Sequence, residues 1–160
     1  MIEFEKLDVN NIPSAFSLMG KHQRENLNTY FFIRSESHLI IIEHLDNFYP
    51  NGERRIFSYQ LEIPKAGLKY FIDSVGRFFL HEDEGGVPFG KMSVYDAIDG
   101  ETIQIFRAHS ADQYGGGYAL MTLDRRIGRV SKQLIFSDHE LFECGLMDVL
   151  KDIAKELEAE

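Results

Sequence analysis

The sequence of 160 residues contains a single cysteine, Cys144, and no tryptophan. One cysteine cannot form a disulfide within the chain, a pattern typical of proteins from reducing compartments. No apolar run approaches the roughly 18 residues that a membrane span requires. The first ten residues are acidic where a signal peptide would be basic and then apolar. We therefore expect a soluble, cytoplasmic protein.

Positive charge is also scarce. The chain has 17 Lys and Arg residues against 26 Asp and Glu residues, which gives a net charge of −9. A field of that sign repels phosphate and attracts basic partners, whereas dedicated nucleic-acid-binding proteins usually have the opposite balance. One segment departs from this pattern, because four cations lie within residues 122–132: Arg125, Arg126, Arg129 and Lys132.

The residue patterns of catalysis and metal binding are missing as well. The "YGGGY" segment at 114–118 lacks the Lys-Ser/Thr pair that completes a phosphate-binding loop. No histidine is marked out as a partner that would activate Cys144. None of the histidines has metal-ligand spacing: His22, His38, His44, His81, His109 and His139. We predict a protein that is not an enzyme and that uses no metal or cofactor.

Two amphipathic helices are predicted, over residues 64–80 and 137–158. Apolar residues recur on one face of each, and Phe79 falls on the buried face of the first. Pro64 suits the first position of a helix, and Ser137 with Glu140 has the spacing of a capping box.

Eight strands are predicted around these helices. They cover residues 2–7, 29–34, 39–45 and 55–63 in the first half, and 91–98, 102–108, 118–123 and 129–136 in the second. Asp99-Gly100 is a strong signal for a hairpin turn. Residues 81–90 have the composition of a linker, and a short extra helix is expected over residues 12–22.

The two halves share an apolar pattern. Gly67-Leu68 corresponds to Gly145-Leu146, and Leu45-Asp46 corresponds to Leu123-Asp124. Residues 29–37 align with 102–110 if residues 111–115 are an insertion. We interpret this as a structural duplication. The sequence thus predicts an α+β fold: a single domain, residues 1–160, made of two pseudo-repeats (1–80 and 91–160) joined by the linker 81–90, each a four-stranded antiparallel sheet followed by a long helix.

The repeated β-β-β-β-α pattern, with the segments "TYFF", "RIFSYQLEIP" and "GLKYFIDSVGRF", resembles the PUR and Whirly group of single-stranded nucleic-acid-binding folds. That resemblance implies binding of single-stranded DNA or RNA to a sheet face that carries aromatic and cationic side chains. The net charge departs from that expectation. The pattern of the cations favours a solvated hairpin, with phosphate contact and a protein interface as the alternatives. The residues implied for this role are Tyr30, Phe32, Tyr118, Arg125, Arg126, Arg129 and Lys132.

The overall profile is similar to that of bacterial immunity proteins and antitoxins, including those of contact-dependent growth inhibition. Such a protein would bind and neutralise a basic toxin, for example a nuclease, with acidic groups that imitate phosphates. This is our first hypothesis for the function, and nucleic-acid binding is the alternative. The residues expected to contact the partner are Glu82, Asp83, Glu84, Asp99, Glu101 and Asp112, with Tyr114 as an aromatic anchor.

Overall fold

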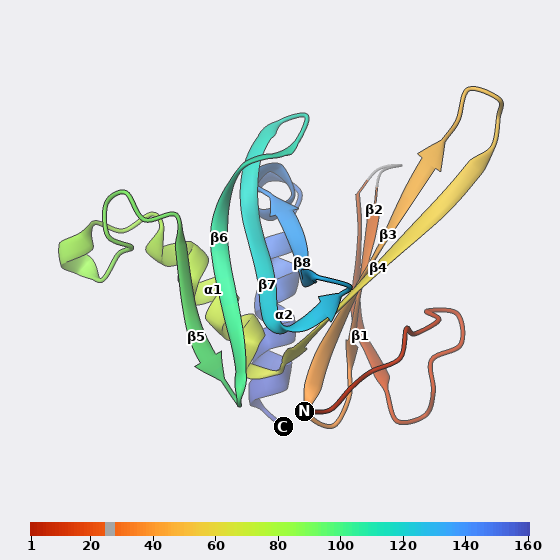
Figure 1. Ribbon diagram of the computed structural model, residues 1–160, viewed down its shortest axis with the longest axis horizontal. Helices are drawn as coiled ribbons and strands as arrows, with labels where there is room; N and C mark the ends of the chain where they lie inside the picture. The colour runs from red at the N-terminus through yellow and green to blue at the C-terminus, as the bar shows by residue number, and fades with distance from the viewer. Residues whose placement is uncertain (25–27) are drawn as a thin grey trace. The chain divides into compact units, whose positions relative to one another are not determined.

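Each half of the chain contains four strands followed by a helix. The computed structural model describes residues 1–24 and 28–160 (Figure 1). The first half comprises β1 (Ser17–Arg24), β2 (Asn28–Arg34), β3 (His38–Phe48), β4 (Arg54–Pro64) and α1 (Ala66–Arg77). The second comprises β5 (Ser93–Ile98), β6 (Glu101–Asp112), β7 (Gly115–Ile127), β8 (Val130–Ser137) and α2 (Leu146–Glu158). A 3-10 turn, Glu82–Glu84, precedes β5, and a π-helical turn, His139–Glu143, precedes α2.

The strands form two separate antiparallel sheets. Their orders are β1-β2-β3-β4 and β5-β6-β7-β8, so each strand pairs with its neighbour in the sequence. The predicted α+β class is confirmed. No helix among the described residues has both the length and the apolar character needed to cross a membrane.

The compact units of the structure do not coincide with the two halves of the sequence. Contacts divide the chain into residues 1–62 and 63–160, so the boundary falls within β4 and not within residues 81–90. Helix α1 therefore belongs to the second unit, where it contacts α2, β5 and β6. Each unit is described separately below.

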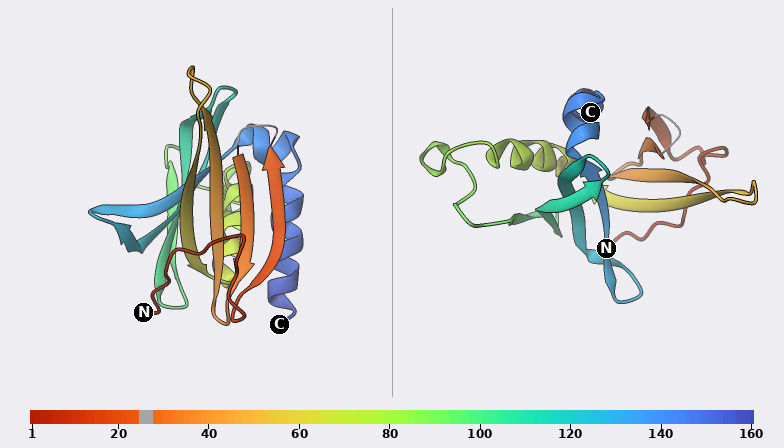
Figure 2. Two further views of the ribbon diagram at one scale, coloured as in Figure 1. Left: turned by 90° about the vertical axis from the view of Figure 1, so that its right-hand side faces the viewer. Right: turned by 90° about the horizontal axis from the view of Figure 1, so that it is seen from above.

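In the first unit, the irregular N-terminal segment covers one face of the sheet (Figure 2). Ile33, Ile40 and Ile42 form a buried cluster, because alternate side chains of neighbouring strands point to the same face. The segment packs its apolar side chains against this cluster: Phe4, Leu7, Val9, Ile12 and Phe16.

Gln60 holds that segment in place. Its side-chain carbonyl accepts the Leu7 N–H at 2.7 Å, and its amide group donates to the Glu5 carbonyl at 2.9 Å. The predicted strand over residues 2–7 is therefore wrong, since the backbone groups of Glu5 and Leu7 bond to the Gln60 side chain and residues 2–7 are not part of either sheet. The helix expected over residues 12–22 is also wrong. Residues from Ser17 onward pair with β2, and Ile12 and Phe16 pack against the buried cluster from the irregular segment.

In the second unit, α1 and α2 lie on the same side of the sheet (Figure 1). Ile103, Leu120 and Leu134 are buried and share the inner face, because β6, β7 and β8 pair in that register. The ring of Phe71 on α1 packs against that of Phe136 on β8, with centroids 5.4 Å apart. The apolar face of α2 is buried as the periodicity predicted: Leu146, Leu150, Ile153 and Leu157.

The turn signals were accurate, but the helix limits were not. Asp99 and Gly100 have φ of 48° and 85° in the β5–β6 turn, as their sequence predicts. The predicted capping box is present: the Glu140 N–H donates to Ser137 Oγ at 3.0 Å, and the Ser137 N–H donates to Glu140 Oε1 at 3.5 Å. However, the expected helix 137–158 is divided at Gly145, whose φ is 82°, and Pro64 ends β4 instead of opening α1.

Two glycine substitutions test these helix limits. Gly145→Ala should lower the free energy of unfolding by about 1 kcal/mol, because alanine is strained at a left-handed φ. Gly76→Ala is the matched control, since Gly76 lies within α1 and an added Cβ would meet no atom within 4 Å. This control should raise the stability by about 0.5 kcal/mol. Urea unfolding measures both changes, and equal effects of the two variants would contradict the assignment.

Candidate functional site

Arg125 and Glu101 bind each other in the interior of the second unit. Arg125 Nε donates to Glu101 Oε1 at 2.7 Å and Nη2 donates to Oε2 at 3.3 Å, and each side chain is only 5% exposed. The pair joins β7 to β6. Arg125 was a candidate for phosphate contact and Glu101 for contact with a basic partner, but neither is at the surface.

The aromatic residues expected to stack on bases are also buried. Tyr30 and Phe32 are 0% exposed, and Tyr118 is packed between Phe78 and the guanidinium of Arg107. Their aromatic rings are buried, so these residues do not form the exposed sheet-face platform that the resemblance implies. Whether these rings are buried depends on which face of each strand points inward. The short alternating segments of the sequence do not determine that face.

The remaining cations of the basic segment lie at the β7–β8 hairpin. Arg126 and Arg129 are exposed, and Arg126 Nη1 donates a hydrogen bond to the Arg129 carbonyl oxygen at 3.5 Å. Lys132 is half-buried. The exposed neighbours of these arginines are Ile127 and Val130, which are not aromatic. The seven residues implied by the PUR and Whirly resemblance therefore do not form one exposed surface.

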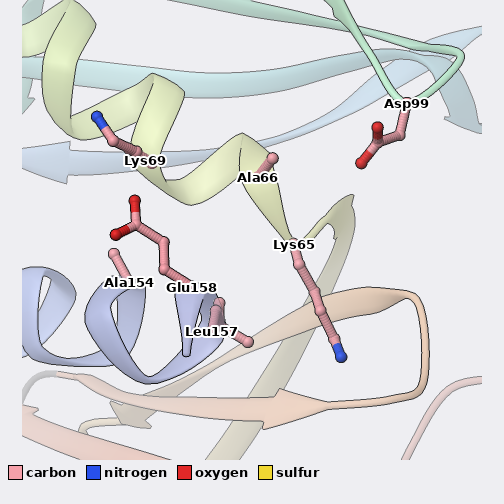
Figure 3. A pocket seen from close by; sticks show the side chains of 7 residues that line it. All are labelled: Lys65, Ala66, Lys69, Asp99, Ala154, Leu157 and Glu158. Carbon is pink, nitrogen blue, oxygen red and sulfur yellow. The ribbon is translucent and has the colours of Figure 1, made fainter. Parts of the chain in front are cut away.

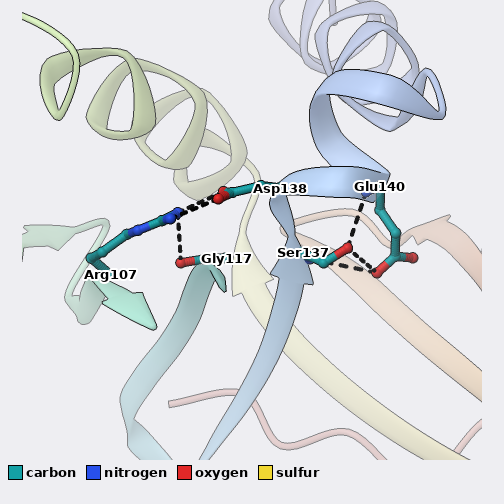
Figure 4. A network of polar contacts seen from close by, with 5 residues as sticks. All are labelled: Arg107, Gly117, Ser137, Asp138 and Glu140. Carbon is teal, nitrogen blue, oxygen red and sulfur yellow. Dashed lines mark hydrogen bonds and ion pairs between the residues drawn. The ribbon is translucent and has the colours of Figure 1, made fainter. Parts of the chain in front are cut away.

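Arg107, which the sequence analysis did not single out, organises the end of β8 (Figure 4). Its guanidinium forms two hydrogen bonds with the Asp138 carboxylate, at 2.5 and 2.6 Å, and donates to the Gly117 carbonyl at 3.3 Å. The Asp138 hydrogen bonds raise the pKa of Arg107 above its ordinary value, and burial raises the pKa of Tyr118. Arg107 therefore stays charged and anchors the residue that precedes the π-helical turn.

Beyond that anchor, the π-helical turn presents an aromatic side chain to solvent. Phe142 lies within the turn and is 47% exposed, and its ring meets the ring of Phe79 edge to face with centroids 5.6 Å apart. Phe79 is 67% exposed. It was expected on the buried face of a helix reaching residue 80, but α1 ends at Arg77, and the ring projects outward instead.

In the chain, an acidic turn follows Phe79 after two residues, Leu80 and His81. Glu82, Asp83 and Glu84 form the 3-10 turn, and all three are exposed. Arg77 holds the turn to the end of α1, because its Nε donates to the Gly85 carbonyl at 3.0 Å and its carbonyl accepts the Val87 N–H at 3.1 Å.

We call these residues the aromatic–acidic surface: Phe79, Leu80, Phe142, Glu82, Asp83, Glu84 and Glu143. Next to it, a surface hollow of about 300 Å³ lies among Leu80, His81 and Phe89. Of the three predicted acids, Glu82 thus lines this hollow beside exposed apolar groups that sequence reasoning missed. The only sequence signal for them was the pair of phenylalanines beyond the helix end.

Tyr114 and Asp112 lie at the same end of the unit. The Tyr114 ring stacks on His139 with centroids 4.0 Å apart, and His139 bonds to the Glu143 carboxylate. The Tyr114 N–H donates to Asp112 Oδ1 at 2.8 Å, which closes the β6–β7 turn. Tyr114 is therefore an exposed ring held against the turn that carries Phe142, as an aromatic anchor requires.

Asp99 lies elsewhere, at the rim of a pocket formed by α1, α2 and the β5–β6 turn (Figure 3). The seven predicted partner residues therefore fall in separate places: Glu82, Asp83 and Glu84 in the 3-10 turn, Asp112 and Tyr114 at the β6–β7 turn, Asp99 at this pocket and Glu101 in the buried ion pair. Within the described ranges 1–24 and 28–160, no three His, Cys, Asp or Glu side chains are grouped to hold a metal.

No family model matches this chain, and no curated protein matches it.

The buried ion pair between Arg125 and Glu101 allows a test by substitution of its partners. Arg125→Ala should lower the free energy of unfolding by about 3–5 kcal/mol, because it leaves the Glu101 carboxylate buried without its cation. Arg129→Ala, on the same hairpin but exposed, should change it by less than about 0.5 kcal/mol. Replacing both partners, with Arg125→Met and Glu101→Leu, should recover most of the loss. Urea unfolding distinguishes these outcomes, and a small effect of Arg125→Ala would show that the pair is solvated.

Proposed function

We propose that this protein is a non-catalytic binding protein of the immunity or antitoxin type, which masks a basic protein toxin through its aromatic–acidic surface. The observation that carries the proposal is the exposed Phe79–Phe142 pair, with exposed carboxylates near it in the chain, at residues 82–84 after Phe79 and at Glu143 after Phe142. Large aromatic side chains surrounded by polar groups are the arrangement from which protein interfaces derive most of their affinity.

The two parts of this surface have separate roles. Phe79 and Phe142 would enter apolar pockets of the partner and supply affinity, since exposed rings lose contact with water on binding. The carboxylates would steer the encounter, and attraction of this kind raises association rates by about 10 to 1000-fold at low salt. A net charge of −9 adds long-range attraction to the same partner.

A nuclease suits the role of partner on chemical grounds. A protein that binds phosphates has a cationic cleft, and exposed carboxylates such as Glu82, Asp83 and Glu84 imitate the charge of the phosphates it normally holds. Occupation of that cleft would exclude nucleic acid without any chemical step by this protein.

Single-stranded nucleic-acid binding of the PUR or Whirly type is the second candidate. The order of four strands and a helix in each half of the chain supports it. The burial of Tyr30, Phe32 and Tyr118 and the pairing of Arg125 with Glu101 count against the residues implied by that resemblance. We therefore rank it below the binding of a basic protein.

The first test of the proposed function is affinity capture with the immobilised protein from the cells that produce it. A basic protein should be retained at physiological salt, and Phe79→Ala/Phe142→Ala should reduce its retention at least tenfold, because aromatic anchors contribute about 2 kcal/mol or more each. Tyr95→Ala, an exposed aromatic substitution on β5, is the matched control and should have no effect. Equal retention by all three proteins would reject this surface.

The same partner allows a test of the carboxylates. Glu82→Lys/Asp83→Lys/Glu84→Lys should slow association at low salt by about tenfold or more. Asp148→Lys/Asp152→Lys/Glu156→Lys makes the same charge change on exposed residues of α2 and should slow it less. Identical association rates for the two variants would mean that net charge, and not the acidic turn, steers the encounter.

The nucleic-acid alternative has its own measurement, the fluorescence anisotropy of a labelled single-stranded oligonucleotide at low and physiological salt. We expect no binding at physiological salt, because the field of the protein is negative. Micromolar binding that Arg126→Ala/Arg129→Ala weakens, with a flatter salt dependence, would favour the alternative instead.

A further inference from the structure

A pocket of about 220 Å³ opens at the end of the second unit where α1 begins and α2 ends (Figure 3). Its apolar wall comprises Ala66, Ala154 and Leu157. Four charged side chains complete the lining: Lys65, Lys69, Asp99 and Glu158. The pocket is separate from the aromatic–acidic surface, because Lys65 and Ala66 stand at the start of α1 and Phe79 lies beyond its end.

The ammonium groups of the two lysines that line the pocket are each paired with a carboxylate outside it. Lys65 Nζ lies 2.6 Å from Glu160 Oε2, and Lys69 Nζ lies 2.6 Å from Asp73 Oδ2. The hydrogen bond to Asp73 raises the pKa of Lys69, so this lysine stays protonated. In Figure 3, both ammonium groups point away from the space between Ala66 and Ala154.

The carboxylates of Asp99 and Glu158 differ from the two ammonium groups in their pairing. Among the residues that the structure describes, neither Asp99 nor Glu158 makes a hydrogen bond or an ion pair, although the charge of Glu158 acts on Lys69. The Asp99 carboxylate points toward the pocket from the β5–β6 turn, and the Glu158 carboxylate lies beside Ala154 (Figure 3). The acceptors available to an occupant are therefore anionic, and the wall between them is apolar.

We propose that this pocket binds an alkylammonium or alkylguanidinium group, the chemistry of a lysine or arginine side chain. The methylene chain would lie on Ala66, Ala154 and Leu157, and the cationic head would reach the carboxylate of Asp99 or that of Glu158, which flank the pocket on opposite sides (Figure 3). This division of a long cationic side chain between apolar and charged surroundings is how lysine and arginine are normally accommodated. The inference stands whether or not the aromatic–acidic surface binds a toxin.

The turn that carries Asp99 permits a clean removal of charge. Asp99 has a left-handed φ of 48°, which asparagine also tolerates, and Asn-Gly favours the same hairpin turn. Asp99→Asn therefore keeps the geometry of the turn and removes only the anion. Glu158→Gln does the same at the end of α2, and Glu156→Gln is its matched control because Glu156 is exposed on α2 and does not line the pocket.

The test is a chemical-shift titration of the full chain with N-acetyl-lysine-N′-methylamide. We expect saturable shifts at residues 66 and 154, with a dissociation constant on the order of 1 mM for so small a ligand. Asp99→Asn and Glu158→Gln should each weaken binding about threefold to tenfold, and Glu156→Gln should leave it unchanged. N-acetyl-norleucine-N′-methylamide, which has the same chain without the charge, should bind at least tenfold more weakly.

Two results would overturn the proposal: equal affinity for the lysine and norleucine derivatives, or lysine binding that survives both substitutions together. A parallel titration with 1,4-diaminobutane separates the sources of the cation. Tighter binding of the capped lysine identifies a protein side chain as the occupant, and tighter binding of the diamine identifies a free amine.

Discussion

The ion pair between Arg107 and Asp138 determines how the chain leaves the second sheet, and the candidate site depends on it. Asp138 directly precedes the π-helical turn, so the two hydrogen bonds from Arg107 anchor that turn to β6 and, through the Gly117 carbonyl, to β7. The Ser137–Glu140 capping box holds the same corner from the backbone side. With the corner held at both points, Phe142 projects to solvent and His139 supports the ring of Tyr114.

Desolvation explains why the charges of this chain divide into two groups. A charge removed from water must be paired, and Arg125 and Glu101 meet that requirement with each other inside the second unit. Glu82, Asp83 and Glu84 remain at the surface, where water solvates their charge. Arg125, one of the few cations of the chain, is thus paired inside the second unit. The acidic turn after Phe79 stays exposed.

In the first unit, an irregular segment covers the apolar face of the sheet. Its sheet has a buried apolar cluster at Ile33, Ile40 and Ile42, and the described residues of that unit, 1–24 and 28–62, contain no helix to cover this cluster. The irregular N-terminal segment does so instead, held by the side chain of Gln60, which satisfies a backbone donor and a backbone acceptor at once. One polar side chain therefore substitutes for the backbone ladder that a further strand would have provided.

The sequence by itself determined much of the local structure: the strand–helix order of the second half, the Asp99-Gly100 turn, the Ser137–Glu140 cap and the apolar face of α2. These features depend on residues close together in the chain, whose spacing and backbone preferences are visible in one dimension. Only the tertiary structure decided that α1 ends before Phe79, that Arg125 meets Glu101, and that Asp99 faces the pocket formed by α1 and α2. Each of these outcomes depends on side chains distant in the sequence, because pairing and burial are settled by which faces meet and not by the spacing of any one segment.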